Sequence, residues 1–256
     1  MPELPDVEVY KKLAENAINH RIEKVSTNYD QVNEITEQTI KKHLQGNKFS
    51  GIKRHGKQLF ISINDGNNLV LHFGMTGQIL QYDSEAPKHT ALDIRLANGN
   101  NFAVTSVRKL GKIDICKDID KYLEDNEIGP DALELVKEDF AELFKGRGYA
   151  KSTLMNQKKI SGIGNIYSDE ILYHAGIHPK KENRSFSEKD ITKLYETMKD
   201  VLKTAADNEA DVDKMPESYL LGRRVDSAEC GICGGKIVKE KISGRGSYHC
   251  NEHQKK

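Results

Sequence analysis

The segment Phe60-Ile61-Ser62-Ile63-Asn64-Asp65-Gly66-Asn67-Asn68-Leu69-Val70-Leu71-His72-Phe73 contains two short apolar runs on either side of a polar turn. In each run the apolar residues stand at alternate or adjacent positions, which is typical of strands packed in a sheet. The intervening Asp65-Gly66-Asn67 has the composition of a hairpin turn. The segment therefore predicts two strands joined by a tight turn.

Similar short apolar runs, separated by polar turns, extend in both directions over about residues 21–117. Leu92-Asp93-Ile94-Arg95-Leu96 is a further alternating run, and a second glycine turn, Asn98-Gly99-Asn100, follows it. Many short strands separated by such turns are typical of a β-sandwich. We expect this architecture for residues 1–117.

Helical spacing of apolar residues appears before, within and after the predicted sandwich. In the first of these helices the apolar positions are Val7, Tyr10, Leu13, Ala14 and Ala17. The helices expected are residues 5–18, Glu34–Leu44, and about 131–146, 151–159, 165–175 and 186–206. An acidic linker is expected at 118–130, a helical domain at 131–225, and at 226–256 a glycine-rich segment too small for a core of its own.

Basic and acidic residues balance, with 39 of each among 256 residues. A nucleic-acid-binding protein usually has a basic excess, so the total argues mildly against DNA, although separate basic stretches permit one positive face. No apolar run approaches the roughly 20 residues that span a bilayer, and the N-terminus is too acidic and proline-rich for a secretory signal. We therefore expect a cytoplasmic protein, and nothing in the sequence calls for more than a monomer.

Cysteine clusters at the C-terminal end, where three of the four cysteines fall in the last 27 residues. Cys230, Cys233, Cys250 and His253 form the pattern C-x2-C-x16-C-x2-H, whose donors suit tetrahedral zinc. Such a short segment needs a metal in order to fold, so we expect one structural Zn²⁺ with no open coordination position. His249 lies beside the cluster, but its spacing makes it the weaker ligand candidate.

Pro2 offers unusual chemistry once Met1 has been removed, which a proline at the second position favours. Its nitrogen is then a secondary amine that can attack C1′ of a deoxyribose, displace the base and leave an iminium (Schiff-base) intermediate, whose β-elimination breaks the strand. Glu3 is placed to act as general acid or base at the sugar. A Met-Pro-Glu start is common among proteins, so this reading needs support elsewhere in the chain.

Six motifs provide that support, because in this order they resemble the formamidopyrimidine-DNA glycosylase/endonuclease VIII family over nearly the whole chain. The motifs are Met1-Pro2-Glu3-Leu4-Pro5-Asp6-Val7-Glu8, His55-Gly56-Lys57-Gln58-Leu59, His72-Phe73-Gly74-Met75-Thr76-Gly77, Val107-Arg108-Lys109-Leu110-Gly111-Lys112, Gly162-Ile163-Gly164-Asn165-Ile166-Tyr167-Ser168-Asp169-Glu170 and Gly244-Arg245-Gly246-Ser247-Tyr248-His249-Cys250. The resemblance implies an α+β fold: an N-terminal β-sandwich with flanking helices, then a helix–two-turns–helix domain that carries a zinc-finger β-hairpin.

The resemblance also implies an activity and a partner. We expect a base-excision-repair DNA glycosylase with AP-lyase activity that binds double-stranded DNA, associates with the nucleoid when bound, excises oxidised or ring-opened bases and cleaves by β/δ-elimination. Pro2, Glu3 and Lys57 would be catalytic. Lys57 and His72 would hold phosphates around the lesion.

Further DNA contacts follow from the same resemblance. Asn165 would cap a helix whose N-terminus presents free N–H groups to a phosphate, and Arg245 would approach the same backbone. When the damaged nucleotide leaves the stack, Met75 would fill the gap, Arg108 would bond the orphaned base and Leu110 would wedge into the stack.

Several features depart from the formamidopyrimidine branch, to which the chain is otherwise closer. Asp6 stands where a glutamate is usual, Leu110 where a phenylalanine wedge is usual, and His253 where a fourth cysteine is usual. The segment Ala206–Glu229 is short and does not match the longer stretch whose loop closes over oxidised guanine. We therefore expect inefficient recognition of 8-oxoguanine, and the zero net charge predicts weaker non-specific DNA binding.

The readings that stay open are an enzyme that prefers oxidised pyrimidines and a non-catalytic reader of damaged or abasic DNA. The second would keep Asn165, Arg245 and the zinc finger without using the catalytic end. A zinc-stapled protein-interaction module explains the finger but not the other motifs.

Overall fold

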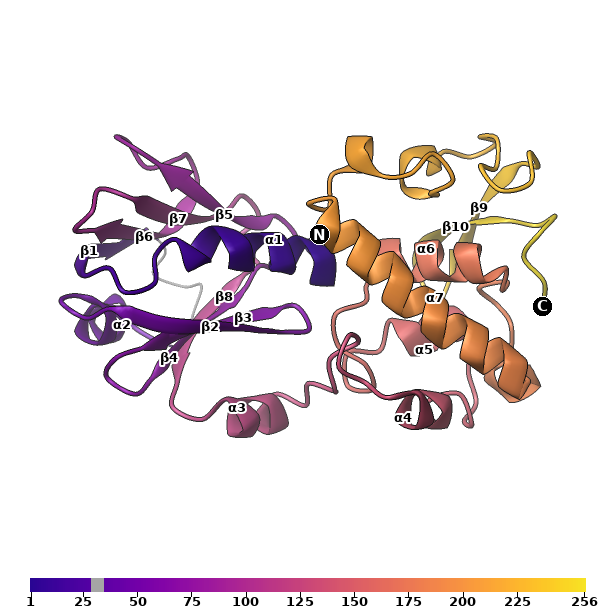
Figure 1. Ribbon diagram of the computed structural model, residues 1–256, viewed down its shortest axis with the longest axis horizontal. Helices are drawn as coiled ribbons and strands as arrows, with labels where there is room; N and C mark the ends of the chain where they lie inside the picture. The colour runs from indigo at the N-terminus through magenta and orange to yellow at the C-terminus, as the bar shows by residue number, and fades with distance from the viewer. Residues whose placement is uncertain (29–34) are drawn as a thin grey trace. The chain divides into compact units, whose positions relative to one another are not determined.

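The computed structural model describes residues 1–28 and 35–256, which divide into two compact units. One unit comprises residues 1–2 and 6–127, and the other comprises residues 3–5 and 128–256 (Figure 1). Helix α1 (Leu4–Glu15) thus belongs to the first unit except for its first two residues, which pack with the second.

The first unit is a β-sandwich of two four-stranded antiparallel sheets. One sheet has the strand order β1-β6-β7-β5 and the other β2-β3-β4-β8. The strands are β1 (Ile22–Thr27), β2 (Phe49–His55), β3 (Gln58–Ile63), β4 (Asn68–His72), β5 (Gly77–Tyr82), β6 (Thr90–Leu96), β7 (Asn101–Ser106) and β8 (Lys112–Cys116). The predicted sandwich is confirmed.

A single apolar core lies between the two sheets and includes the buried face of α1. Leu59, Ile61 and Leu71 face it from one sheet and Leu92 and Ile94 from the other, all nearly inaccessible to solvent. Burying side chains of this size contributes roughly 1.5–3 kcal/mol each. This shared core is what fixes the register of both sheets, because a one-residue slip would turn each apolar set outward.

The predicted turns have the conformations that their residues favour. Gly66 between β3 and β4 has φ +89° and Gly99 between β6 and β7 has φ +83°, values that a side chain would strain. The Asp65 carboxylate accepts from the amide of Asn67 at 2.8 Å, and Asn98 accepts from Asn100 at 3.1 Å. These are side-chain turns of the kind that asparagine and aspartate form.

Two helices of this unit differ from the prediction. Helix α2 (Glu37–Leu44) begins later than expected, because Thr36 caps it by accepting from the amide of Thr39 at 3.2 Å. The expected first residue, Glu34, lies outside the described residues. The stretch expected to be a linker contains helix α3 (Ile119–Asp125), which Asp118 caps.

The second unit contains a set of helices and a terminal β-hairpin. Its α-helices are α4 (Lys137–Glu142), α5 (Ala150–Leu154), α6 (Asn165–Ala175) and α7 (Glu188–Asp207), with short 3-10 turns η1 (Asn183–Ser185), η2 (Val212–Lys214) and η3 (Leu221–Arg223). The helices predicted at 131–146 and 151–159 are shorter than expected. Residues 131–136 form a turn instead, in which Asp131 accepts from the amide of Leu133 at 2.8 Å.

Helices α6 and α7 form the centre of this unit. Eight of the eleven residues of α6 are buried, so it runs through the core rather than over the surface. Gly176 ends α6 in the left-handed conformation, with φ +69°. Helix α7 is amphipathic, with a capping box formed by Ser187 and Asp190.

The hairpin consists of β9 (Ile237–Ile242) and β10 (Arg245–Cys250), paired antiparallel around a turn at Gly244. Its apolar side chains share a small core with Tyr173 of α6 and Leu220. In the part of the chain that the structure describes, no helix has the length and apolar character needed to cross a membrane.

Candidate active site and metal cluster

Glu3 is buried at the start of helix α6, with 1% of its surface exposed. Its carboxylate accepts from three backbone amides, those of Gly164 at 2.7 Å, Ile166 at 2.9 Å and Tyr167 at 3.1 Å. The unpaired amides and the dipole of a helix N-terminus favour a negative charge at this position. Glu3 is therefore held in one orientation by backbone that cannot rotate away.

The glycine turn that precedes α6 lets the segment around Glu3 and Leu4 pack closely against the start of the helix. Gly162 has φ +111°, and a Cβ there would come within 2.7 Å of the Leu4 side chain. The amide of Leu4 donates to the carbonyl of Gly162 at 3.0 Å. Gln157 secures the turn from the other side, because its Nε2 donates to Ile163 O at 2.6 Å and its Oε1 accepts from Gly162 N at 3.1 Å. The sequence reasoning missed Gln157, whose only signal is its position five residues before the glycine motif.

Asn165 has a different position from the one expected. Gly164 is the N-cap of α6 and Asn165 is its first residue, so the predicted cap role is wrong. The Glu3 carboxylate also accepts hydrogen bonds from backbone amides of α6 that were expected to be free to bind a phosphate. The Asn165 side chain instead donates from Nδ2 to the carbonyl of Gly246 at 3.0 Å, which joins α6 to the hairpin.

Pro2 directly precedes Glu3 in the chain and is buried, whereas Met1 is 47% exposed. While Met1 is attached, the proline nitrogen belongs to an amide and is not nucleophilic. Asp6, half-buried in the first turn of α1, is the next acidic residue along the chain.

Lys57 and His72 lie near each other at one end of a sandwich sheet. Lys57 follows Gly56 in the turn between β2 and β3, and His72 at the end of β4 pairs with Gln58 and Lys112 on the neighbouring strands. Burial, with the charges of Lys57 and Lys112, lowers the pKa of His72 from 6.5 to about 4. The imidazole is therefore neutral at pH 7 and can donate a hydrogen bond, while the lysines supply positive charge.

Arg54 holds the Lys57 turn in place, and the sequence reasoning missed it. Its guanidinium is buried, bonds the Glu8 carboxylate of α1 at 2.6 Å and donates to the carbonyl of Gly56 at 3.1 Å. The turn that carries Lys57 is thus connected to the N-terminal helix. The only signal for Arg54 was its place in a basic stretch.

Met75, Arg108 and Leu110 lie on two loops that touch. The amide of Arg108 donates to Thr76 Oγ1 at 3.0 Å. A Cβ on Gly74 would come within 2.4 Å of the backbone carbonyl of Leu110, so only glycine permits this approach. Leu110 is 50% exposed and Arg108 is exposed, while Met75 is half-buried. The structure brings these three predicted residues together, with apolar groups open to solvent.

A buried ionic network fixes the hairpin to α6. The buried Asp169 carboxylate accepts a hydrogen bond from Lys151 Nζ at 2.5 Å and forms an ion pair with Arg224, whose Nη1 lies 2.9 Å away. It also accepts from the hydroxyl of Ser247 at 2.6 Å and the amide of Tyr248 at 3.0 Å. Arg245, at the exposed start of β10, is two residues from Ser247. The network was not predicted from sequence, since its members lie far apart along the chain.

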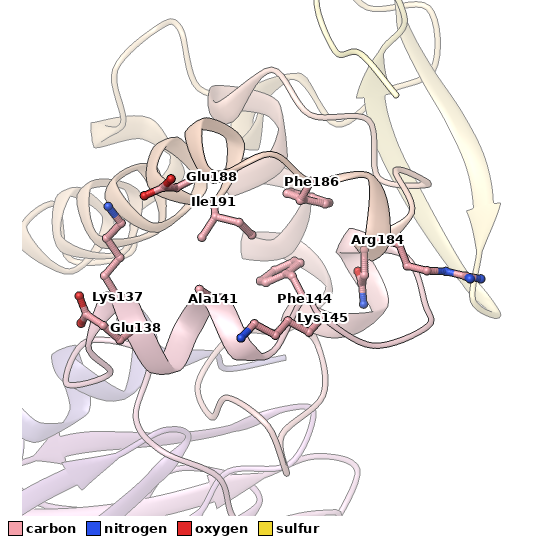
Figure 2. A pocket seen from close by; sticks show the side chains of 10 residues that line it. Lys137, Glu138, Ala141, Phe144, Lys145, Arg184, Phe186, Glu188 and Ile191 are labelled. Atoms are coloured by element: carbon pink, nitrogen blue, oxygen red, sulfur yellow. The ribbon is translucent and has the colours of Figure 1, made fainter.

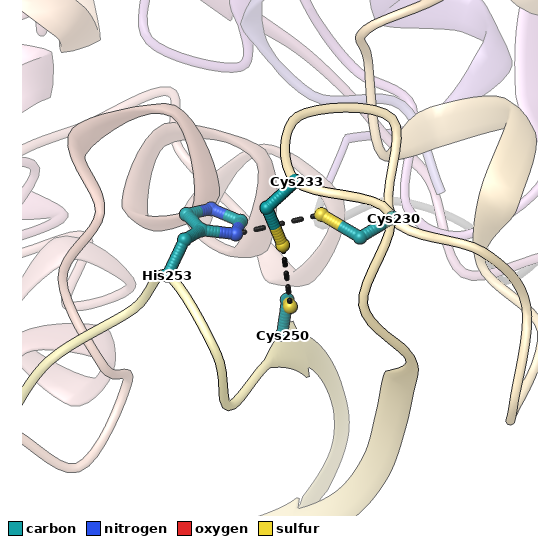
Figure 3. Close-up of side chains that lie close together, drawn as sticks. All are labelled: Cys230, Cys233, Cys250 and His253. Atoms are coloured by element: carbon teal, nitrogen blue, oxygen red, sulfur yellow. Dashed lines mark hydrogen bonds between the residues drawn. The ribbon is translucent and has the colours of Figure 1, made fainter.

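The four predicted metal ligands converge at the base of the hairpin. Their donor atoms lie within 4.8 Å of one another. Cys230 Sγ lies 3.4 Å from His253 Nδ1 and Cys233 Sγ lies 3.6 Å from Cys250 Sγ, as Figure 3 shows. The cysteines are free rather than disulfide-bonded. This cluster can bind a metal ion.

Tyr173 of α6 contacts two of the four ligands, His253 and Cys230, and orients the histidine ring for metal binding. Its carbonyl lies 2.9 Å from His253 Nε2, which must carry the ring proton because a carbonyl can only accept. The lone pair of Nδ1 is thereby left facing the sulfurs, as in metal sites whose second ring nitrogen bonds a carbonyl. The Tyr173 hydroxyl lies 3.0 Å from Cys230 Sγ. His249, the weaker candidate, is not part of this ligand set.

A cavity of about 590 Å³ opens beside α4 and the start of α7 in the second unit (Figure 2). Phe144 and Phe186 contact each other in its wall, with their ring centroids 5.0 Å apart and their planes tilted by 43°, and charged side chains surround it. None of the predicted site residues lines this cavity, so the candidate site is not located there.

Comparisons with known proteins agree with this geometry. The family model of the formamidopyrimidine-DNA glycosylase N-terminal domain matches residues 1–113, and that of the formamidopyrimidine-DNA glycosylase H2TH domain matches residues 128–215. The formamidopyrimidine-DNA glycosylase of Lactococcus lactis subsp. cremoris is 31% identical over the full length of both chains.

Solved structures give the same result. Lactococcus lactis Fpg bound to DNA that contains N7-benzyl-Fapy-dG superposes with a TM-score of 0.89 at 28% identity, over all of both chains. The same enzyme bound to DNA with an abasic site also has a TM-score of 0.89 at 28% identity, over 99% of this chain and all of the other. This chain therefore belongs to the formamidopyrimidine-DNA glycosylase family.

Proposed function

We propose that this chain removes ring-opened and oxidised bases from duplex DNA and cleaves the resulting abasic site, using Pro2 as the nucleophile. Its class follows from the family to which it belongs: a bifunctional DNA glycosylase and AP lyase of base excision repair. The observation that carries the proposal is the fixed Glu3 carboxylate directly beside Pro2. A mere surface glutamate would not occupy three backbone amides in a buried position.

The reaction begins when the secondary amine of Pro2 attacks C1′ of the damaged nucleotide. The N-glycosidic bond breaks, and the base leaves with the bonding electrons and takes up a proton. The amine on C1′ then loses its proton, and its lone pair expels O4′, which takes up a proton as the sugar ring opens to an iminium ion. The iminium ion makes the proton on C2′ acidic, and loss of that proton expels the 3′ phosphate by β-elimination; a δ-elimination then expels the 5′ phosphate. Glu3 acts at the sugar as general acid or base, since a positioned carboxylate can move a proton there.

Residues outside the reacting centre hold the DNA in this proposal. Lys57 contributes a cation and neutral His72 a hydrogen-bond donor to phosphates near the lesion. Arg245 and the second N–H of the Asn165 side-chain amide donate to phosphates of the same DNA strand. Met75, Arg108 and Leu110 enter the space that the extruded nucleotide leaves. The exposure of Arg108 and Leu110, on a loop joined to the one that carries Met75, supports this role.

The ion of the cysteine and histidine cluster is Zn²⁺ in this proposal. Three thiolates and one imidazole match zinc in type and number, and they leave no position open for catalysis. The ion would hold the hairpin that carries Arg245. Removing it with a chelator should abolish DNA binding while the fold of the sandwich persists.

The lesion class that we propose is the ring-opened purine. The solved relative bound to N7-benzyl-Fapy-dG supports this class, and the short segment Ala206–Glu229 argues against efficient 8-oxoguanine excision. Oxidised pyrimidines remain the alternative substrate, because Leu110 supplies apolar bulk without an aromatic ring.

Borohydride trapping tests the proposal directly. Protein that lacks Met1 is incubated with duplexes containing an abasic site, a ring-opened guanine, 8-oxoguanine or an oxidised pyrimidine, and the adduct is located by peptide mass spectrometry. An adduct on Pro2 is expected with the abasic and ring-opened duplexes, whereas a form that retains Met1 should give none. Absence of adduct and cleavage on every duplex, together with retained binding, would make the chain a non-catalytic reader of damaged DNA.

A further inference from the structure

A second group of metal-ligating side chains lies outside the cysteine cluster. His178, Glu240 and His249 present donor atoms that all lie within 4.8 Å of one another. Two of the three are buried, His178 with 7% and His249 with 2% of its surface exposed. We propose that this triad is a binding site for a second divalent transition-metal ion, Zn²⁺ in the cell, distinct from the one held by the cysteines.

Three separate segments build this triad. Glu240 of β9 and His249 of β10 project from the same face of the hairpin, because Glu240 pairs with Ser247 and His249 with Val238 in the strand register. His178 comes from the turn after α6, where its amide donates to the carbonyl of Lys255 at 2.8 Å. The two imidazole rings meet edge to face, with their centroids 4.6 Å apart.

The Nδ1 atom of His249 is buried and forms no hydrogen bond with any residue that the structure describes, although the Asn251 side chain interacts with the ring. A buried imidazole nitrogen without a partner destabilises the folded state, so such an atom is rare unless it binds something. His249 also lines a cavity of about 550 Å³ together with His178 and Glu240, which leaves room for an ion and its waters. This unpartnered atom is the feature that points to a ligand.

The donor set favours a metal of the borderline class. Two imidazoles and one carboxylate suit Zn²⁺, Co²⁺, Ni²⁺ or Cu²⁺, whereas Mg²⁺ and Ca²⁺ prefer oxygen ligands alone. A metal needs neutral imidazole, and burial lowers the pKa of His178 from 6.5 to about 4. With three protein ligands, the ion keeps one coordination position for water.

Lys180, Lys239, Lys255 and Lys256 line the cavity, but Lys239 and Lys255 make contacts away from the triad. Lys239 lies over the Tyr248 ring, on the opposite face of the hairpin, and Lys255 Nζ donates to the carbonyl of Glu252 at 2.7 Å. Lys180 pairs with Glu240, and both side chains are about one-third exposed, at 34% and 37%. An exposed ion pair contributes little to stability, so a divalent ion can replace Lys180 at the carboxylate.

Metal binding changes one hydrogen bond that can be observed. The amide of Lys180 donates to His178 Nδ1 at 3.1 Å, so the ring proton of the metal-free protein lies on Nε2. When Nε2 binds the ion, that proton moves to Nδ1 and the amide of Lys180 loses its acceptor. The Lys180 amide resonance therefore reports on occupancy of the triad.

Calorimetric titration of protein that already holds one zinc per chain tests the proposal. Added Zn²⁺ should bind with a stoichiometry of one further ion, and the amide resonance of Lys180 should shift in step. Co²⁺ bound at the triad should lack the thiolate charge-transfer band that marks the cysteine cluster. His178→Gln and Glu240→Gln should each weaken this second binding at least tenfold, while His20→Gln, a half-buried histidine of the sandwich unit, should leave it unchanged.

The Zn²⁺ titration of the wild-type protein can overturn the proposal by itself, even if the variants fail to fold. If it binds no further Zn²⁺ at 100-fold excess, the triad is not a metal site. If instead inorganic phosphate binds and His178→Gln abolishes that binding, the cavity is an anion site. The outcome is independent of Pro2 chemistry, since borohydride trapping and metal stoichiometry are measured separately.

Discussion

Two glycine-containing turns of this molecule differ in how far the groups around them are buried and hydrogen-bonded. At the start of α6, the groups around Gly162 and Gly164 are buried and bonded, with Glu3 and Gln157 occupying the backbone amides and carbonyls. In the sandwich, Gly74 joins two loops whose apolar side chains face solvent, including Leu110 at 50% exposure. In the proposed mechanism, the first turn fixes a reacting group before DNA arrives, and the second leaves its groups available for insertion.

The difference follows from what each task requires. Proton transfer at a sugar needs a carboxylate within hydrogen-bond reach of one atom, so its position has to be set in advance. Filling the space left by a flipped nucleotide needs apolar bulk that is exposed until the duplex opens. Variants at the two turns show whether the turns have these separate roles.

The largest effect is expected from Glu3→Gln. A carboxamide presents an NH2 group to amides that are themselves donors, and it cannot transfer a proton, so the rate of lesion cleavage should fall about 10²- to 10⁴-fold. The affinity for an uncleavable abasic-site analogue should change much less. Single-turnover kinetics and a binding assay separate the two quantities. Glu15→Gln, an exposed glutamate at the C-terminal end of α1, is the control and should cleave at the wild-type rate.

Equal losses of rate and affinity for Glu3→Gln would mean that the carboxylate only supports the fold of the turn. The melting temperature of the variant decides how much of the loss is structural. Glu3→Asp sharpens this test, because the shorter side chain keeps the charge but cannot reach all three amides.

Asp169→Asn should come next, through stability. Lys151 would be left as an uncompensated buried charge, and breaking such a pair costs about 3–5 kcal/mol. Denaturant unfolding of the second unit measures this loss. The double variant Lys151→Met/Asp169→Leu should recover part of it, whereas no recovery would mean that the bonds to Ser247 and Tyr248 dominate.

The helices and strands that the sequence predicted best are those with a strong local signal. The alternating runs around Ile61 and Leu71 and the glycine-bounded helix at 165–175 are periodic and have clear ends, so their predictions agree with β3, β4 and α6. The metal ligands were predictable because their spacing is short and their chemistry specific.

The features that the sequence could not predict depend on contacts between distant residues. Nothing local to Asn165 shows that the amides of α6 are taken by Glu3, more than 160 residues away. The helix predicted at 131–146 failed for a similar reason, since Asp131 bonds the backbone two residues on and stabilises a turn in place of the first helical residues. The polar triad of His178, Glu240 and His249 likewise has no spacing pattern that would mark it.

A smaller effect is expected from Gly74→Ala, which tests the contact between the two sandwich loops. The added Cβ would come within 2.4 Å of the Leu110 carbonyl group, and the residue has φ +59°. Strain of this kind costs on the order of 1–3 kcal/mol, and displacement of Leu110 should lower activity on damaged bases. Gly66→Ala is a matched control, because Gly66 has φ +89° but open space around it.

The comparison of these two glycine variants separates backbone strain from the loop contact. Thermal melting gives the stability of each, and steady-state cleavage of a ring-opened guanine duplex gives the activity. If both variants lose the same stability and activity, then the approach of Gly74 to Leu110 has no specific role.

The smallest loss of activity is expected from Leu110→Ala. The difference in that loss between two substrates is more informative than its size. Truncating an apolar wedge should reduce kcat/KM on a ring-opened guanine roughly tenfold or less, because a part of the unstacking cost, about 1.4 kcal/mol at most, then lacks compensation. An abasic site has no base to extrude, so cleavage there should change less. Val107→Ala, 59% exposed on the same loop, should leave both substrates unaffected. Equal losses on both substrates would assign Leu110 to general DNA binding, and the exposed loop would then be part of the DNA surface rather than a device for opening the stack.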